Sequence, residues 1–345
     1  MPLLLHGSTG EVFAVLILAS LLTTHFGQWR QSWHGTAPTR KAGQPLLGAP
    51  PMYEGALALL DWDRGTVLWQ APFDTPGGFC FRDDHIYLCS MLGNRIYVLD
   101  EALSITSTLS TPQMNDLHTV INSRRGLLIT SSGLDGIVEL TTDGDLLWAW
   151  LATEHGFDRS PGGIKRQVST SDDLRRRDHG TTMQTTHCNS AIFLDPATED
   201  HILVTLFHQG ALIRVNRRTG RHDVLVDGMS HAHAIRPAPD GLWTCCDSQC
   251  GSVVILEPDF RIRRIIEGSL DWPQDAFTSP DGTVFVADSN HNRVAAYRLD
   301  GTAVGELVVP EEWKFFQIEP VPDAWVARLR GWRPAAHLAK AEVAG

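Results

Sequence analysis

From residue 56 onward, short apolar runs alternate with turn-forming residues along the chain. The clearest example lies between Trp272 and Val309. There the pattern predicts strands at 276–277, 283–288, 294–299 and 303–309, separated by a Pro-Asp-Gly turn, a Ser-Asn-His-Asn-Arg turn and an Asp-Gly turn. Strands that alternate with turn signals at this spacing indicate a four-stranded antiparallel unit.

The same unit recurs along the chain, with further copies that begin near residues 79, 118, 187 and 233. A period of roughly 40 to 50 residues with four strands in each unit is typical of a β-propeller. An inner pair of strands expected within 315–329 and an outer pair at 56–60 and 66–70 would form one more blade from the two ends of the chain. The sequence therefore predicts an all-β fold, a six-bladed β-propeller with four-stranded antiparallel blades. Five or seven blades are the alternatives.

The N-terminal part has a different pattern. Residues 12–22 form an apolar run that is shorter than the about 20 residues needed to cross a membrane. Glu11 precedes it, where a secretory signal would carry basic residues. A signal or anchor, a packed N-terminal element and a disordered extension all remain open. We expect an N-terminal extension and linker at 1–52, the propeller at 53–332 and a C-terminal tail at 333–345. A cytoplasmic location is expected, or a secreted or periplasmic one if residues 1–25 are a signal.

Composition narrows the possible partners. The chain has 345 residues, 43% of them hydrophobic, and a net charge of −11 with no basic block. An acidic surface repels phosphate backbones, so we expect no nucleic-acid partner and no membrane partner. The six cysteines lack the spacing of a disulfide framework. Buried reduced thiols are expected, with a disulfide from Cys250 to Cys245 or Cys246 as the alternative.

Histidines head three of the predicted inner strands. His118, His187 and His233 each precede an apolar run, and Gln274 has the corresponding place in the next unit. A glycine follows His118, His233 and Gln274 at the same distance, which supports a common register. Because the innermost strands of a propeller line its central channel, these four side chains are expected to form a ring at one mouth.

A ring of uncoordinated imidazoles is electrostatically unfavourable, since protonation of one disfavours protonation of the next. A metal ion removes this conflict, and three histidines with an open position are typical of catalytic centres. Nitrogen ligands favour a divalent transition metal, zinc or iron above all. We therefore predict metal ligands at His118, His187 and His233, with catalytic or orienting roles for His231, Gln274 and Asn189. The alternative is three unrelated histidines that are satisfied by backbone carbonyls.

A long segment without strand pattern, residues 155–185, leads into the third inner strand. Loops of this length are usually functional or disordered. We expect an insertion that forms a lid or pocket wall over the axial site, with a solvated surface loop as the alternative. Arg166 and His179 in this segment, and Arg236 on an inner strand, are candidates to bind a small-molecule substrate, which the arginines suggest is anionic.

Three resemblances to known families add to this picture. The residues Asp288–Val294 resemble the NHL-repeat family of propellers. The histidines at the heads of successive inner strands resemble peptidylglycine amidating lyase, which implies a three-histidine zinc site. In that family Pro-His opens the repeat, whereas here Pro273 precedes Gln274. The segments 143–148, 186–190 and 213–220 are similar to arylsulfotransferases, in which a histidine is transiently sulfated. That resemblance implies roles for His187 and His233, with Arg236 as an anion partner.

Three functional hypotheses follow. The first is a metal-dependent enzyme with a three-histidine centre that acts on a small molecule, as a lyase or hydrolase, with redox chemistry left open. The second is a metal-free sulfuryl transferase with a histidine nucleophile. The third is a propeller that binds a partner without catalysis.

Overall fold

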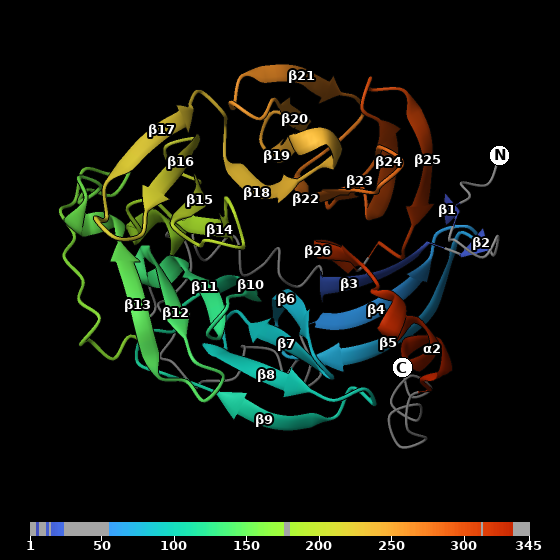
Figure 1. The fold of residues 1–345 in the computed structure, drawn as a ribbon, viewed down its shortest axis with the longest axis horizontal. Helices are drawn as coiled ribbons and strands as arrows, with labels where there is room; N and C mark the ends of the chain where they lie inside the picture. Colours follow the sequence, from blue (N-terminus) through green and yellow to red (C-terminus); the bar gives the residue numbers. More distant parts are fainter. Residues whose placement is uncertain are drawn as a thin grey trace.

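Six four-stranded antiparallel sheets surround a central axis in the computed structural model (Figure 1). The structure describes residues 5–6, 12–13, 15–23, 55–175, 180–311 and 313–333. The prediction of a six-bladed β-propeller is confirmed.

Five blades are continuous in sequence, and each runs from an inner strand to an outer one. Blade 1 comprises β6 (Pro76–Arg82), β7 (His85–Ser90), β8 (Arg95–Leu99) and β9 (Ile105–Leu109). Blade 2 comprises β10 (Leu117–Asn122), β11 (Leu127–Ser131), β12 (Gly136–Leu140) and β13 (Leu146–Leu151). Blade 3 comprises β14 (Cys188–Phe193), β15 (His201–Leu206), β16 (Ala211–Asn216) and β17 (His222–Val226). Blade 4 comprises β18 (Ala232–Pro237), β19 (Trp243–Asp247), β20 (Ser252–Leu256) and β21 (Ile262–Glu267). Blade 5 comprises β22 (Pro273–Thr278), β23 (Thr283–Asp288), β24 (Arg293–Arg298) and β25 (Ala303–Val308).

The closing blade combines both ends of the chain. Its order from the axis outward is β26 (Trp313–Pro320), β3 (Leu16–Thr23), β4 (Gly55–Asp61) and β5 (Thr66–Phe73). One C-terminal strand therefore joins three N-terminal strands, whereas the sequence suggested two from each end. The second part of the expected C-terminal pair is instead helix α2 (Asp323–Gly331). The described residues also contain the short pair β1 (Leu5–His6) and β2 (Val12–Phe13) and four 3₁₀ turns, η1 (Ser132–Leu134), η2 (Ala152–Glu154), η3 (Thr181–Met183) and η4 (Pro239–Gly241).

The apolar run at the N-terminus is part of this blade. β3 pairs with β26 on one side and β4 on the other, and its residues are buried except for half-buried Thr23. A strand that is paired at both edges and covered on both faces needs a continuous apolar sequence, which resembles a signal segment. The boundary of the propeller at residue 53 is therefore corrected to include Leu16–Thr23. Residues 24–54 and 334–345, the expected linker and most of the expected tail, lie outside the described residues.

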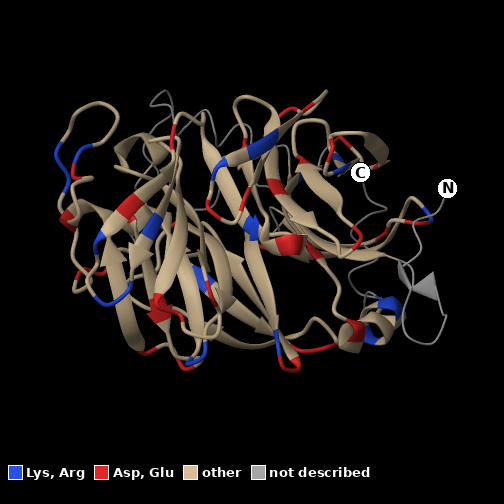
Figure 2. Cartoon of the chain, turned by 45° about the horizontal axis from the view of Figure 1, so that its top comes forward, with Lys and Arg blue, Asp and Glu red and all other residues tan. Residues whose placement is uncertain are grey.

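Apolar side chains fill the spaces between adjacent blades. Ile17 and Leu21 of β3, for example, share a cluster with Phe277 and Phe285 of blade 5. All six cysteines are free, as expected, although Cys250 is exposed. Acidic and basic residues are interspersed on the strands and loops in view (Figure 2). Over the described ranges, no helix has the length and apolar character to cross a membrane.

Gln317 on β26 connects the closing blade to blade 1. Its Oε1 accepts a hydrogen bond from the backbone N–H of Phe79 at 3.0 Å, and its Nε2 donates to the Phe79 carbonyl at 2.8 Å. A Cβ atom at the neighbouring Gly78 would lie 2.8 Å from Gln317 Oε1 and 2.5 Å from the carbonyl oxygen of His118. A residue without a side chain is therefore required where these strands approach each other.

The buried position of β3 predicts a large effect when one of its apolar side chains is shortened. Ile17→Ala is expected to lower the free energy of unfolding by about 2–4 kcal/mol, because Ile17 is fully buried. The control Leu68→Ala removes a side chain from β5 of the same blade that is 36% exposed, and it should change stability by less than about 1 kcal/mol. Urea denaturation measures both, and equal, small effects would contradict the assignment of β3.

Candidate active site at the propeller axis

The inner strands do not carry the three histidines at one register. In blades 2 to 5, the first residue of the inner strand pairs with the last residue of the second strand; these first residues are Leu117, Cys188, Ala232 and Pro273. His118, His233 and Gln274 therefore share their position with Asn189, whereas His187 lies two residues earlier. The predicted common register is wrong for His187. The first turn of blade 3 is longer, so the glycine that marks the register in the other blades is missing.

The residue before each of five inner strands has a left-handed backbone. Its φ lies between 39° and 62° at Thr75, Asp116, His187, His231 and Trp272. We call Asp116, His187, His231 and Trp272 the mouth layer, and His118, Asn189, His233 and Gln274 the channel layer. Non-glycine residues adopt this conformation where the surroundings impose it. At His187 the backbone N–H donates to the buried carboxylate of Asp135 at 3.2 Å.

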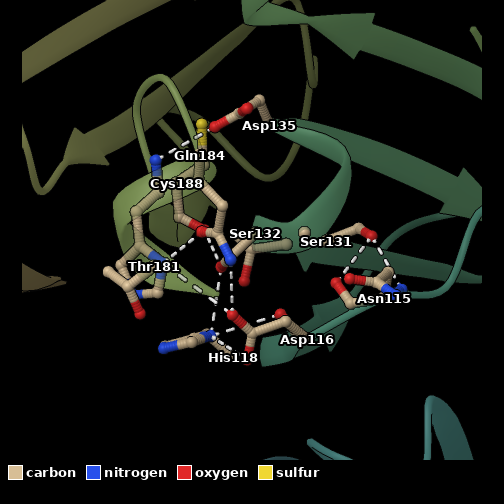
Figure 3. A network of polar contacts seen from close by, with 12 residues as sticks. Asn115, Asp116, His118, Ser131, Ser132, Asp135, Thr181, Gln184 and Cys188 are labelled. Atoms are coloured by element: carbon tan, nitrogen blue, oxygen red, sulfur yellow. Dashed lines mark hydrogen bonds and ion pairs between the residues drawn. The ribbon is translucent and has the colours of Figure 1, made fainter. Parts of the chain in front are cut away.

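His118 is fixed by a serine that bridges two blades. Its Nδ1 lies 3.0 Å from Ser132 Oγ, and the same hydroxyl donates to the carbonyl of Cys188 at 2.6 Å (Figure 3). Because the hydroxyl proton is used on Cys188, Ser132 accepts from His118 Nδ1–H. The Nε2 atom of His118 therefore keeps its lone pair when the ring is neutral.

His233 repeats this arrangement two blades further on. Its Nδ1 lies 2.7 Å from Ser248 Oγ, which donates to the carbonyl of Pro273 at 2.6 Å. A second contact joins Nδ1 to the carbonyl oxygen of His231 at 2.9 Å. The same geometric argument assigns the Nδ1–H tautomer to His233.

A side chain of the insertion holds the His187 ring in place. Its Nδ1 donates to Gln184 Oε1 at 2.5 Å, and Gln184 Nε2 donates to Asp116 Oδ2 at 2.9 Å. The His187 and His118 rings meet edge to face, with their centroids 4.5 Å apart. Burial of the ring, and next the neighbouring His118, lower the pKa of His187 well below its usual value. His187 is therefore an uncharged imidazole at neutral pH.

An aromatic side chain lies against two of the three histidines. Phe207 lies against both His187 and His233, with centroid distances of 4.9 and 5.3 Å, and stacks on His231 at 4.1 Å. Among the described residues, no group of three or more His, Cys, Asp or Glu side chains is arranged to hold a metal ion. The metal centre expected at His118, His187 and His233 is therefore not shown and stays a prediction.

Two other predicted residues, Asn189 and Gln274, line a cavity of about 280 Å³ inside the channel. Asn189 Oδ1 accepts from Thr205 Oγ1 at 2.7 Å, while its buried Nδ2 has no hydrogen-bond partner. Gln274 Oε1 accepts from the indole N–H of Trp272 at 2.8 Å. The channel layer thus places two amide groups at the end of the cavity that is next to the mouth layer.

Arg236 lies further along the same cavity and is paired with two carboxylates. It bonds to Asp275 at 2.8 and 3.2 Å and to Glu319 at 2.5 Å. Burial opposes its charge, but Asp275 and Glu319 outweigh that effect and raise the pKa of Arg236. The positive charge of Arg236 is thus already balanced by two carboxylates inside the protein. The structure therefore gives no support to its expected role in binding an anion.

The insertion contributes to the site mainly through Gln184 and through Arg166. The Arg166 guanidinium bonds to Asp135 and to the carbonyl of Gly133, so it positions the carboxylate that holds His187. His179 lies outside the described residues. A role of the segment 155–185 as a lid stays a prediction.

Sequence reasoning missed several residues that shape the site, namely Asp116, Ser132, Asp135, Gln184, Phe207, His208 and Ser248. The serines carry a usable signal, since Ser132, Ser248 and Ser289 each follow the second strand of a blade. The other side chains come from loops whose path no repeat pattern specifies.

The chain is a six-bladed β-propeller protein. No protein-family model and no curated protein matches it. A solved structure of the nidogen/laminin complex contains a chain that is 13% identical with a TM-score of 0.57, over 88% of this chain and 97% of that one. A protein of unknown function from Bacteroides caccae is 11% identical with a TM-score of 0.55, over 90% and 100% of the two chains. Virginiamycin B lyase from Staphylococcus aureus has 12% identity and a TM-score of 0.47, over 69% and 71%. The first two similarities support the propeller architecture that the NHL resemblance implied.

The serine contacts predict the tautomer of two histidines. In ¹H–¹⁵N spectra of the histidine rings above pH 7, His118 and His233 should be Nδ1–H tautomers with protected protons. Ser132→Ala should allow His118 to populate both tautomers and should destabilise the fold by about 1–2 kcal/mol, because the buried carbonyl of Cys188 loses its donor. Ser289→Ala is the matched control, since the inner strand of blade 5 carries Gln274 in place of the histidine. An unchanged His118 tautomer in Ser132→Ala would contradict the assignment.

The lowered pKa of His187 predicts a loss of stability in acid. The unfolded chain binds a proton on this residue at about pH 6.5, whereas the folded protein binds it only at a lower pH. The free energy of unfolding should therefore be at its full value above about pH 6.5 and decrease as the pH falls toward the folded-state pKa. His187→Asn, which tolerates a left-handed backbone, should flatten this dependence in urea denaturation between about pH 7.5 and 5.5. His85→Asn on β7 is the control and should leave the slope unchanged.

Proposed function

We propose that the protein is an enzyme that uses histidine acid–base chemistry on a small molecule at the axial mouth, in a lyase or hydrolase type of reaction. The contact between His118 and His187 carries this proposal. Both rings are buried and held at Nδ1 by partners within the protein, and Nε2 of each is the proposed contact with a substrate. A pair of oriented imidazoles is the usual equipment for moving a proton to or from a reacting group.

His187 is the proposed general base. Its lowered pKa keeps it uncharged at neutral pH, so it accepts a proton at Nε2 from a carbon acid or from a water molecule. His118 is the proposed general acid: its protonated form donates from Nε2 to the leaving group, and the two rings exchange protons with water between turnovers. Asp116 lies 3.8 Å from Nδ1 of each ring and stabilises whichever imidazolium forms.

His231 and Trp272 of the mouth layer are half-buried, with their ring centroids 5.7 Å apart, and are the proposed substrate contacts. His208 lies beside His187 with ring centroids 6.1 Å apart, and its Nε2 donates to the carbonyl of Thr181 in the insertion at 2.8 Å. Aromatic and imidazole walls suit a small organic substrate.

Sulfuryl transfer is the second candidate. An uncharged imidazole with Nε2 exposed to substrate is a nucleophile as well as a base, and the low pKa of His187 favours this form. The segment that contains His187 is also the one similar to arylsulfotransferases. A histidine that carries the mass of one sulfuryl group after incubation with an aryl sulfate would favour this candidate over the first.

The proposal predicts which variants lose turnover. Esters, lactones and carbonyl compounds with a leaving group at the β-carbon form the test panel, and any substrate that is turned over is then used for comparison. His187→Gln and His118→Asn should each lower kcat/KM by about 10²- to 10⁴-fold, the usual contribution of a general acid or base. His85→Asn should retain the wild-type value.

Two outcomes would overturn this assignment. Histidine variants with wild-type turnover would favour a non-catalytic binding propeller. Activity that is lost on dialysis against a chelator and restored by zinc or iron would favour the metal-dependent alternative.

A further inference from the structure

The channel beneath the histidines has an ion cluster that the proposed chemistry does not use. The cavity of about 280 Å³ extends from the channel layer at Asn189 to Glu319 and Pro322, near the far ends of the inner strands. Its walls are largely apolar and include Phe81, Ile121 and Phe316. A mostly apolar cavity with a few polar groups is the usual form of a small-molecule site.

The ionised groups in this cavity leave an excess of negative charge. Arg236 and Asp275 form a paired unit with two hydrogen bonds, and Asp275 also accepts from the backbone N–H of Ile318 at 2.9 Å. Glu319 is a second carboxylate on the same guanidinium, and its side chain is 28% exposed. Burial raises the pKa of the Cys80 thiol to about 12, so this lining residue adds no charge at neutral pH. One cation thus faces two anions in a low-dielectric channel.

The end of the cavity next to the mouth layer has a hydrogen-bond donor without an acceptor. Asn189 is 3% exposed, and its Nδ2 is buried without a hydrogen-bond partner. Leaving such a donor unpaired is energetically costly, so a native structure usually has a reason for it. An acceptor on a bound molecule would satisfy it.

From these features we propose that the cavity between Asn189 and Glu319 in the axial channel binds a small organic cation. This cation is an amine whose apolar body also carries a carbonyl acceptor. The ammonium group lies toward Glu319, and the carbonyl accepts from Asn189 Nδ2. The walls cover the apolar body, and an anionic ligand is disfavoured. This site is independent of the acid–base chemistry at the mouth, since binding requires no turnover.

Three benzamides that differ only at the para position test this selectivity. The probes are 4-(aminomethyl)benzamide, 4-methylbenzamide and 4-carboxybenzamide, and titration calorimetry at about pH 8, where imidazole is neutral, gives their Kd values. The cation should bind about tenfold more tightly than the methyl compound, and the carboxylate should bind at least about tenfold more weakly than the methyl compound. Absence of binding by all three, or a carboxylate that binds as well as the amine, would overturn the proposal.

Two variants locate the site. Glu319→Gln should reduce the advantage of the amine over the methyl compound to about twofold or less, while the matched control Glu267→Gln, an exposed carboxylate on β21, should leave it unchanged. Asn189→Ala should weaken all three ligands by about five- to tenfold, because they share the carboxamide. A preserved amine preference in Glu319→Gln, or unchanged affinities in Asn189→Ala, would contradict the assignment. If Glu319→Gln does not fold, the order of the three ligands and the Asn189 variant decide.

Discussion

The geometry of the axial site depends on one buried carboxylate. Asp135 accepts hydrogen bonds from the backbone N–H groups of Thr185, Thr186 and His187, and it pairs with Arg166 of the insertion. This network holds the left-handed backbone of His187 and brings the insertion to the same point. His187 thus supplies an imidazole in blade 3, where the channel-layer position carries Asn189.

Much of the architecture could be predicted from the sequence, because strands and turns alternate with a regular period from residue 56 onward. The closing blade was harder to predict for a physical reason. Ile17 and its neighbours belong to a strand with both faces covered, so their sequence lacks the alternation that marks half-buried strands. The same apolar character suits a signal segment, and only the pairing with β26 distinguishes the two.

The site was only partly predictable. The positions of His118 and His233 could be predicted by counting residues to the next glycine, because both blades keep the glycine that marks the register. Counting failed at His187, where a longer first turn removes that marker. Long-range partners such as Asp116 and Gln184, 68 residues apart, leave no trace in a repeat pattern. The expected metal centre therefore rested on a register that only the strand pairing could check.

Closure of the ring has a consequence for the newly made chain. β3 is synthesised well before its inner partner β26, which is nearly 300 positions later, and Ser20 Oγ accepts from the N–H of Gln317 across a separation of 297 residues. Until β26 leaves the ribosome, the sheet that contains β3 has an open edge that can pair with other chains. Such distant contacts slow folding, so this architecture has its greatest risk of aggregation just before β26 emerges.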